Sequence, residues 1–498
     1  MWFDERMTWG VHIKKIIDKC RKVLNIMRCL VGTEWGADRK SLKAIYTGLI
    51  RSVLDYGCIV YNSAADTNLH KLNIIQHQAL RICTGAFKTS STAALQVEMG
   101  EMPLKVRRDQ LSLNYWSNLQ GQRKDHPTLE VLKPGWEKEK KQLKSFGWVI
   151  KNKVNEMNLN QLDICQTVPL TTIPPWILPD AKVDLALLEK KEKEKYHIMN
   201  KYIVLEHLNK YYNYIQIYTD ASKNTSNRVG IAFIIPQFHI KIGKRISDGV
   251  SVYTGEMLAL LLAVQWVEEV RPLKSIICSD SSSSLISLQN NQSDSRPDIL
   301  IEIQQTLYRI NMMGLVVNFV WVPAHNEIKG NEMADRMAKE STNKVRVDIN
   351  VSFGITEIKG IIKQKAKDRW QKLWDEERKG RWLYKIQKRI GQMRITERNR
   401  REEIIISRLR MGHTGLNRSL FLIGKHQTGK CDCGEDETVE HVILNCNKYW
   451  IQRNRLTSKL SNMKIKLDIV DLLRKESGSR GYQVIFEFLK QSRLYNRI

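Results

Sequence analysis

The feature that most constrains the fold is a change of hydrophobic pattern at Tyr214. Three strand-like segments follow one another there, at residues 214–220, 229–236 and 239–246. After them the pattern predicts a helix at 255–270, a strand at 275–279, helices at 281–288 and 297–312, a strand at 315–321 and a helix at 329–340. Three consecutive strands, followed by strands that alternate with helices, predict a compact α/β domain at residues 211–343.

The chain around this domain is mostly helical in pattern. Residues 1–120 carry apolar residues three and four positions apart with basic residues between them, which predicts amphipathic helices. Residues 121–210 lose this regularity and include a proline-rich stretch at 173–179, so we expect a partly ordered linker. A basic helical region at 344–425 and a tail at 426–498 complete a multi-domain α and α/β protein.

The amino-acid composition indicates which kinds of molecule the protein binds and which classes of protein it cannot belong to. The 498 residues include 80 Lys and Arg against 53 Asp and Glu, a formal charge of +27, which favours a polyanion such as nucleic acid. A hydrophobic content of 42% excludes a wholly disordered basic tail. Nine cysteines, most of them scattered singly, argue against a disulfide scaffold. No apolar run approaches the roughly 18 residues of a membrane span, and the start lacks a signal peptide pattern, so we expect a nuclear or cytoplasmic protein without membrane contact.

Four acidic residues lie at the ends of the elements expected in the α/β domain: Asp220, Glu256, Asp280 and Asp335. Carboxylates that meet at one point repel each other unless a cation neutralises them. Oxygen ligands select Mg²⁺ or Mn²⁺ rather than Zn²⁺, and two such ions can activate water at a phosphodiester. Taken singly, each acid also fits a plainer role, as a helix-end charge for Glu256, an N-cap for Asp280 or a surface residue for Asp335.

The strings that contain these acids resemble ribonuclease H of type I. They are Tyr218–Ser222, Gly255-Glu256, Ser279–Ser281 and Trp321–Asp335, in the order of that family. The resemblance implies a mixed five-stranded sheet, two Mg²⁺ ions held by the four acids, and a histidine, His325, that assists turnover from a mobile loop. It also implies an RNA–DNA hybrid as substrate. Contacts to the hybrid are expected from Ser222, Asn224, Ser281 and Asn331. Ala221 and Ala324 stand where glycine is frequent in the family, a change between small residues.

A second cluster of ligand residues lies near the end of the chain. Cys431, Cys433, His441 and Cys446 form the pattern Cys-x-Cys-x7-His-x4-Cys, which predicts a structural Zn²⁺ site. The alternative is three buried thiols and a hydrogen-bonded histidine, but the polar residues between them favour zinc. With Arg408–Thr414 before it, this string resembles the zinc-binding tail of non-LTR (LINE-type) retrotransposon polyproteins.

The N-terminal helices extend this second resemblance. Trp9–His12, Tyr56-Gly57 and Gln76–Gly85 are similar to the thumb that follows a reverse-transcriptase palm in these elements. No Tyr/Phe-x-Asp-Asp string is present, so we expect the palm to be absent and no DNA synthesis by this chain.

The basic stretch at 363–410 allows two interpretations. Trp370, Trp374 and Trp382 could stack on single-stranded bases, or they could pack inward and leave an outward basic face. We favour inward tryptophans, and a basic face of this kind still binds RNA or DNA without sequence preference.

The function expected from the sequence is therefore hydrolysis of the RNA strand of RNA–DNA hybrids by two-metal-ion catalysis, in a retrotransposon-derived protein without a palm. The alternative is a catalytically inactive relic that only binds nucleic acid. A third hypothesis is a pseudogene product that folds poorly.

Overall fold

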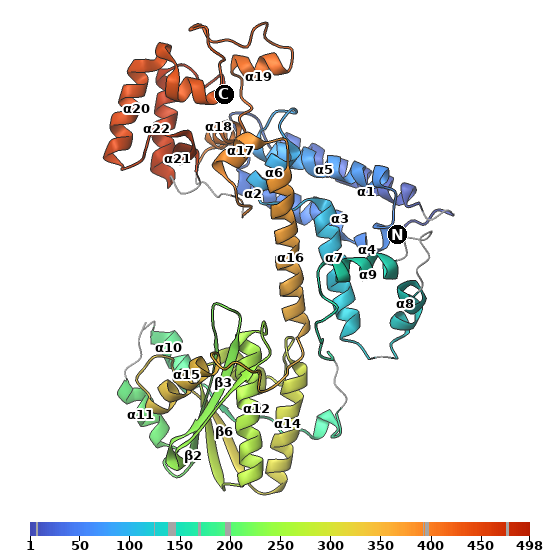
Figure 1. Cartoon of the computed structure of the whole chain (residues 1–498), viewed down its shortest axis with the longest axis vertical. Coiled ribbons are helices and arrows are strands. Elements are labelled where there is room, and N and C mark those ends of the chain that lie inside the picture. Colours follow the sequence, from blue (N-terminus) through green and yellow to red (C-terminus); the bar gives the residue numbers. More distant parts are fainter. Residues whose placement is uncertain are drawn as a thin grey trace. The chain divides into compact units, whose positions relative to one another are not determined.

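The computed structural model describes residues 1–5, 8–123, 125–137, 146–167, 171–194, 201–391, 393, 398–474 and 478–498. Contacts divide the chain into two compact units (Figure 1). The first unit comprises Met1–Leu113, Lys138–Lys153 and Lys363–Ile498, and the second comprises Asn114–Glu137 and Val154–Ile362. The N-terminal block and the C-terminal regions expected from the sequence therefore pack into one unit.

The second unit contains a mixed β-sheet. Its strands are β1 (Val183–Asp184), β2 (Ile215–Lys223), β3 (Val229–Ile235), β4 (Ile240–Ile246), β5 (Lys274–Ser279) and β6 (Val316–Trp321), in the order β1-β6-β5-β2-β3-β4. The first three strands of the expected domain pair antiparallel, whereas β5 pairs parallel with both β2 and β6. The five strands expected for the domain are all present, and Val183 and Asp184 of the expected linker add a sixth strand by pairing parallel with Phe319 and Val320.

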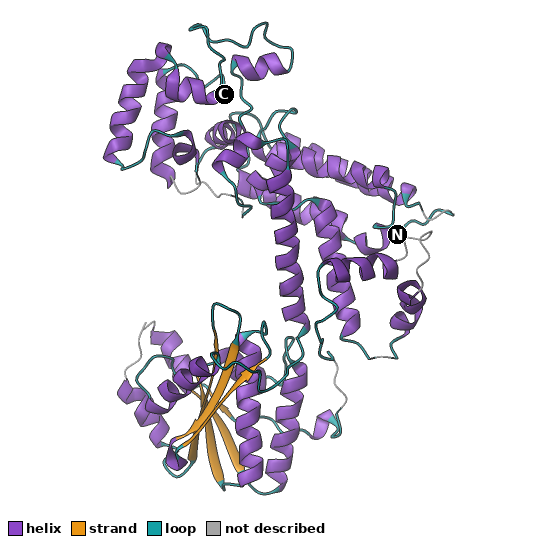
Figure 2. Ribbon diagram, in the orientation of Figure 1, coloured by secondary structure: helices purple, strands orange, loops and turns teal. Residues whose placement is uncertain are grey.

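Helices pack on both faces of this sheet (Figure 2). They are α12 (Val252–Val270), α13 (Ser282–Gln289), α14 (Pro297–Met312) and α15 (Lys329–Ser341). Ile231 contacts Gly255 of α12, whereas a Cβ on its neighbour Gly230 would lie 2.2 Å from the carbonyl oxygen of Ala338 in α15. Adjacent strand residues point to opposite faces, so α12 and α15 cover opposite faces of β3. Glycine at 230 lets the backbone of α15 approach the sheet closely.

The first unit is helical. Its elements are α1 (Gly10–Cys29), α2 (Arg39–Ile45), η1 (Tyr46–Arg51), α3 (Ser52–Asp55), α4 (Cys58–Tyr61), α5 (Asp66–Thr84), α6 (Thr92–Met99), α17 (Arg381–Ile386), α18 (Arg400–Met411), α19 (Asn417–Leu422), η4 (His441–Asn445), η5 (Asn447–Tyr449), α20 (Trp450–Asn462), α21 (Ile469–Leu473) and α22 (Gly478–Gln491). Helices α7 (Leu104–Gln120), α9 (Phe146–Glu156) and α16 (Ile355–Glu376) contribute residues to both units. The remaining elements belong to the second unit, namely α8 (Pro127–Glu137), η2 (Pro175–Ile177), α10 (Ala186–Glu194), α11 (Lys201–Asn209) and η3 (Pro236–Phe238).

Trp370 and Trp374 on α16 are buried against the apolar core of the N-terminal helices. The indole N–H of Trp374 donates to the carbonyl oxygen of Gln387 at 3.1 Å. Trp382 also turns inward, donating to the carbonyl oxygen of Leu409 at 2.9 Å. The interpretation of these tryptophans as core residues is confirmed. None of the described helices is both long and apolar enough to cross a membrane.

A buried ion cluster joins distant parts of the first unit. Glu98 on α6 accepts from Arg39 Nη1 at 3.1 Å and from Arg410 Nε at 2.9 Å. All three side chains are at most 2% exposed. The guanidinium of Arg39 also donates to Ser407 and to the carbonyl oxygen of Glu403. Arg410, a residue of the retrotransposon-like string, is therefore a structural residue of this core.

Replacing Glu98 with alanine should destabilise the first unit by about 3–5 kcal/mol, because two buried guanidinium groups then lose their shared carboxylate. The free energy of unfolding in urea measures this effect. Asp18→Ala is the matched control, because it removes a carboxylate from the exposed pair with Arg21 and should cost about 1 kcal/mol or less. Equal losses in the two variants would contradict the structural role of the cluster.

Candidate active site

Three of the predicted acids meet at one edge of the sheet. Asp220 lies in β2, Asp280 directly follows β5, and Glu256 lies in the second turn of α12. Thr219 of β2 pairs in parallel with Ser279 of β5. The residues that follow them, Asp220 and Asp280, therefore occupy neighbouring positions on adjacent chain segments. Carboxylate oxygens of Asp220, Glu256 and Asp280 lie within 4.8 Å of one another. The topology of the sheet therefore brings together side chains that are far apart in the sequence.

The hydrogen bonds around these carboxylates fix their orientation. Glu256 Oε1 accepts from the backbone N–H of Ala221 at 3.1 Å, which ties α12 to β2. Asp280 Oδ2 accepts from the Nδ2 group of Asn331 at 3.3 Å, and its carbonyl oxygen accepts from the indole of Trp321 at 3.1 Å. Glu256 is 5% exposed, which does not fit a solvated helix-end charge. The carboxylate of Asp280 is held by Asn331, and no N-cap hydrogen bond to α13 is found for it in the described structure.

The fourth acid lies in a neighbouring group on α15. Asp335 has a carboxylate oxygen within 4.8 Å of ligand atoms of His325 and Glu332. Lys339 donates to Asp335 at 2.7 Å from one helical turn away. His325 is exposed on the loop before α15, with a left-handed backbone at φ 51°. The imidazole therefore lies at the surface, beside the carboxylates of Glu332 and Asp335.

Burial and mutual repulsion favour protonated carboxyl groups at this site. Burial, with a further contribution from the charges of Asp280 and Asp335, raises the pKa of Asp220 to about 8. Burial and the charges of Asp220 and Asp280 raise the pKa of Glu256 well above its usual range. Burial also raises the pKa of Asp280, although the bond from Asn331 opposes this shift. A bound cation would remove the repulsion, so this electrostatic pattern fits a divalent metal site.

One atom of the cluster is short of a partner. Glu256 Oε2 is buried and has no hydrogen-bond partner within the described residues. A buried carboxylate oxygen in this state is costly unless a ligand satisfies it. The three carboxylates therefore fit hard cations such as Mg²⁺ or Mn²⁺ both in chemistry and in spacing.

The four residues expected to contact nucleic acid lie in different environments. Ser222 is half-buried in β2, next to the acids. Ser281 makes a hydroxyl–hydroxyl bond with Ser284 at 2.8 Å at the start of α13. Asn224 Oδ1 accepts from the backbone N–H groups of Ser226 and Arg228, each at 3.0 Å, and so holds the turn after β2. Asn331 is buried and holds Asp280, so the structure gives it a positioning role.

Sequence reasoning did not single out Glu332. Its side chain lies close to both His325 and Asp335. Residues three apart on a helix share a face, and this spacing relates Glu332 to Asp335. The three-residue spacing of Glu332 and Asp335 is visible in the sequence, but many acidic residues on helix surfaces share the same spacing.

The four predicted zinc ligands also come together. Ligand atoms of Cys431, Cys433, His441 and Cys446 lie within 4.8 Å of one another. The sulfur of Cys446 lies 3.6 Å from that of Cys431 and 3.7 Å from that of Cys433. A tetrahedral Zn²⁺ with Zn–S bonds of about 2.3 Å requires edges of about 3.8 Å, which agrees with these separations. A disulfide would need about 2.05 Å.

The zinc-type cluster is built into the C-terminal core. Cys431 and Cys446 are buried with residues of α20, α21 and α22. Glu437, between the ligands, accepts from the backbone N–H of Asn417 at 2.6 Å and from Arg497 at 2.7 Å. The ligand loop thus connects helices whose apolar residues form one core.

A comparison with known protein families identifies the domain that contains the carboxylate cluster. Residues 212–343 match the family model for RNase H. The three-strand start, the parallel β2–β5 pair and the convergent acids lie within this segment, which is an RNase H domain.

Two retrotransposon proteins are similar to the chain. One is a probable RNA-directed DNA polymerase from transposon BS of Drosophila melanogaster, 25% identical over 81 residues, which are 16% of this chain and 9% of the relative. The other is a retrovirus-related Pol polyprotein from type-1 retrotransposable element R1 of Nasonia vitripennis, 30% identical over 101 residues, or 20% of this chain and 30% of the relative. The matched stretches thus span less than a third of each relative. These matches confirm the predicted resemblance to LINE-type retrotransposon proteins that contain RNase H.

Proposed function

We propose that the protein hydrolyses the RNA strand of RNA–DNA hybrids. The observation that carries this proposal is the convergence of Asp220, Glu256 and Asp280 within 4.8 Å, at the edge of a sheet that belongs to an RNase H domain. His325 and Asp335 lie together on the neighbouring loop and helix, so every polar residue expected at the site is present.

The acids would hold two Mg²⁺ or Mn²⁺ ions, which when bound supply an activated water and neutralise charge on the leaving 3′ oxygen. The remaining chemistry belongs to the chain itself. Asn331 and the backbone N–H of Ala221 orient Asp280 and Glu256, so the carboxylates are in place before substrate binds. The exposed imidazole of His325 can exchange a proton between the scissile region and solvent.

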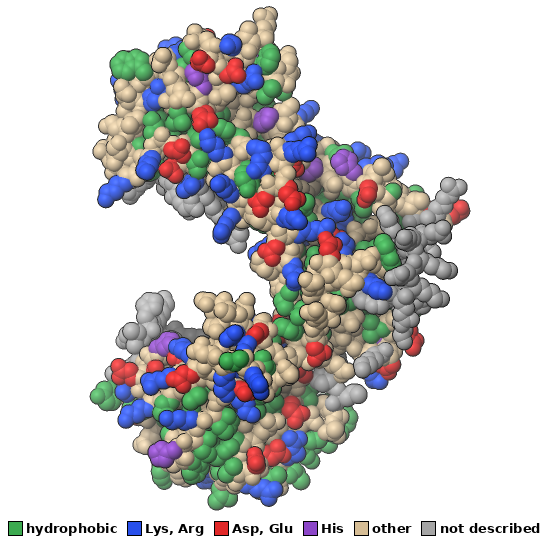
Figure 3. Space-filling model, in the orientation of Figure 1, with side chains coloured by type: hydrophobic (Ala, Val, Ile, Leu, Met, Phe, Trp, Pro, Cys, Tyr) green, Lys and Arg blue, Asp and Glu red, His purple; other side chains and the backbone are tan. Residues whose placement is uncertain are grey.

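The parts outside the domain support binding of nucleic acid. Figure 3 shows Lys and Arg side chains spread over the visible face of the first unit. Such a surface holds a phosphate backbone without reading its sequence. A structural Zn²⁺ at Cys431, Cys433, His441 and Cys446 would keep the C-terminal helices of this unit together.

The decisive experiment incubates the full chain with an end-labelled RNA–DNA hybrid and Mg²⁺. We expect cleavage of the RNA strand alone, and no cleavage of the same RNA when it is single-stranded. Asp280→Asn should lower the rate by roughly a thousandfold or more, because the variant loses a metal ligand charge. Lys22→Gln removes a charge from an exposed position of the first unit and should leave the rate unchanged. Tight hybrid binding without cleavage by the wild type would instead favour the inactive relic.

A further inference from the structure

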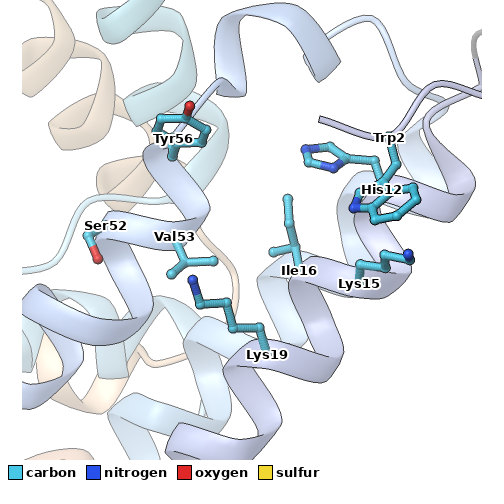
Figure 4. A pocket seen from close by; sticks show the side chains of 8 residues that line it. All are labelled: Trp2, His12, Lys15, Ile16, Lys19, Ser52, Val53 and Tyr56. Atoms are coloured by element: carbon cyan, nitrogen blue, oxygen red, sulfur yellow. The ribbon is translucent and has the colours of Figure 1, made fainter.

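A cavity of about 460 Å³ lies in the first unit, between α1 and the segment that includes α3. Its lining residues are Trp2, His12, Lys15, Ile16, Lys19, Ser52, Val53 and Tyr56. Figure 4 shows Ile16 and Lys19 of α1 facing Val53 across the open space. The volume falls in the range of small-molecule and cofactor sites, roughly 300–1,000 Å³. The cavity belongs to neither of the two ligand clusters described above.

One wall of this cavity carries a buried imidazole without a partner. His12 is 7% exposed, and within the described residues neither of its ring nitrogens makes a hydrogen bond. The rings of Trp9 and Tyr61 pack edge-on against it, with centroids 6.3 Å and 5.6 Å away. A buried polar group that is held in place and left unsatisfied costs stability unless a ligand or water meets it. His12 therefore lines the cavity as a buried imidazole whose two nitrogens are shielded from solvent.

The charge of the lining is positive. Lys15 and Lys19 both line the cavity, and none of its lining residues is acidic. Lys15 Nζ lies 2.9 Å from the ring centroid of Trp2, which holds this ammonium group at the cavity. Burial lowers the pKa of His12, which favours its uncharged form. The charged groups of the lining are thus two cations, which suit an anion such as a phosphate.

Aromatic rings stand at the rim. Tyr56 is 75% exposed and Trp2 is 55% exposed, although both are large apolar groups. An exposed ring face beside lysines is the combination on which single-stranded nucleic acids stack their bases. Bases inside a duplex do not offer free faces, so the arrangement favours an unpaired nucleotide.

We propose that this cavity binds one nucleotide of an unpaired RNA or DNA strand, with its base on the ring of Tyr56 and the phosphates on either side of that nucleotide at Lys15 and Lys19. An acidic peptide would satisfy the lysines but would leave the exposed ring face of Tyr56 unused. The site is separate from the carboxylate cluster, so it does not depend on hydrolysis.

The test measures binding of fluorescent oligouridylate and oligothymidylate to the full chain in the Asp280→Asn background, at one fixed salt concentration. Tyr56→Ala should weaken both single strands about tenfold, whereas Tyr56→Phe keeps the ring and should bind as the parent does. Binding of a DNA duplex should be unaffected by Tyr56→Ala. Stronger binding of oligouridylate than oligothymidylate would support the proposal with RNA as the ligand, and equal binding would support it for both strands.

Charge is tested with a matched pair of double variants. Lys15→Gln with Lys19→Gln should weaken single-strand binding clearly more than Lys22→Gln with Lys71→Gln, which removes two exposed lysines of the same unit outside the cavity. The proposal is overturned if Tyr56→Ala binds as tightly as Tyr56→Phe, if duplex binding falls by the same factor, or if polyglutamate competes as well as oligouridylate.

Discussion

Glu256→Gln should abolish hybrid cleavage and, in buffer without divalent cations, raise the melting temperature by a few degrees. The loss of activity follows because the variant removes the charge of the most buried carboxylate in the cluster, and we expect a rate at least roughly a thousandfold lower. The gain in stability follows because burial, with repulsion from Asp220 and Asp280, disfavours the charged form of this carboxylate in the folded protein. Glutamine keeps an oxygen that can accept from the N–H of Ala221.

The sign of the pH dependence gives a second observable. The folded-state pKa of Glu256 is raised above its unfolded value, so this residue favours folding at pH values below the unfolded pKa and disfavours it as pH rises above that value. The wild type should therefore lose stability between about pH 5 and pH 7, and Glu256→Gln should lose less over the same interval.

Calorimetry of the full chain and a hybrid cleavage assay would check both parts. Glu256→Asp is the control, because it keeps the charge while shortening the side chain, and it should lose activity without gaining stability. A lower melting temperature for Glu256→Gln than for the wild type in metal-free buffer would contradict this account of the cluster.

Cys446→Ser should remove bound zinc and unfold the ligand loop. Cys446 is fully buried, with its sulfur beside those of both other cysteines, so serine leaves an incomplete ligand set inside the core. Structural zinc sites contribute about 10–16 kcal/mol of binding free energy in zinc-finger peptides, so its loss should be among the largest effects in this chain. We expect about one zinc per chain in the wild type and a small fraction of that in the variant.

Zinc content by mass spectrometry and limited proteolysis would measure the change. New cleavage should fall between residues 412 and 450, around the ligand loop. Hybrid cleavage by residues 212–343 should persist, because the carboxylates belong to the other compact unit. Cys29→Ser is the matched control, since Cys29 is exposed and outside the cluster. A full zinc content in Cys446→Ser would show that the other ligands suffice or that zinc binds elsewhere.

The periodic parts of the fold were predictable from the sequence. The expected helix at 297–312 has the observed bounds of α14, and the expected strand at 229–236 differs from β3 by one residue. Both segments contain enough apolar residues to show the helical or strand periodicity in the sequence. The convergence of Asp220 and Asp280 could also be predicted, because acidic residues near the carboxyl ends of two adjacent parallel strands lie on the same side of the sheet.

Other features depend on contacts that no local pattern reports. Two residues, Val183 and Asp184, are too few to show a strand period, and they become β1 only because β6 offers a free edge. The sequence pattern places Arg400 and Arg410 on a basic surface, but both side chains are buried. Arg400 donates to the carbonyl oxygen of Cys83, and Arg410 donates to Glu98. The cavity around His12 forms only when α1 packs beside Ser52–Tyr56, so its lining could not be listed from the sequence.

The ion cluster of Arg39, Glu98 and Arg410 has a consequence for biosynthesis. Its last member emerges from the ribosome more than three hundred residues after its first, so until then Glu98 is paired with Arg39 and lacks the second guanidinium, that of Arg410. The RNase H domain is contiguous in sequence and can fold while the residues after it are still being translated. Trp370, Trp374 and Met411 also belong to the core of the N-terminal helices, so this core is complete only after most of the chain has been made, and contacts over so long a separation form slowly.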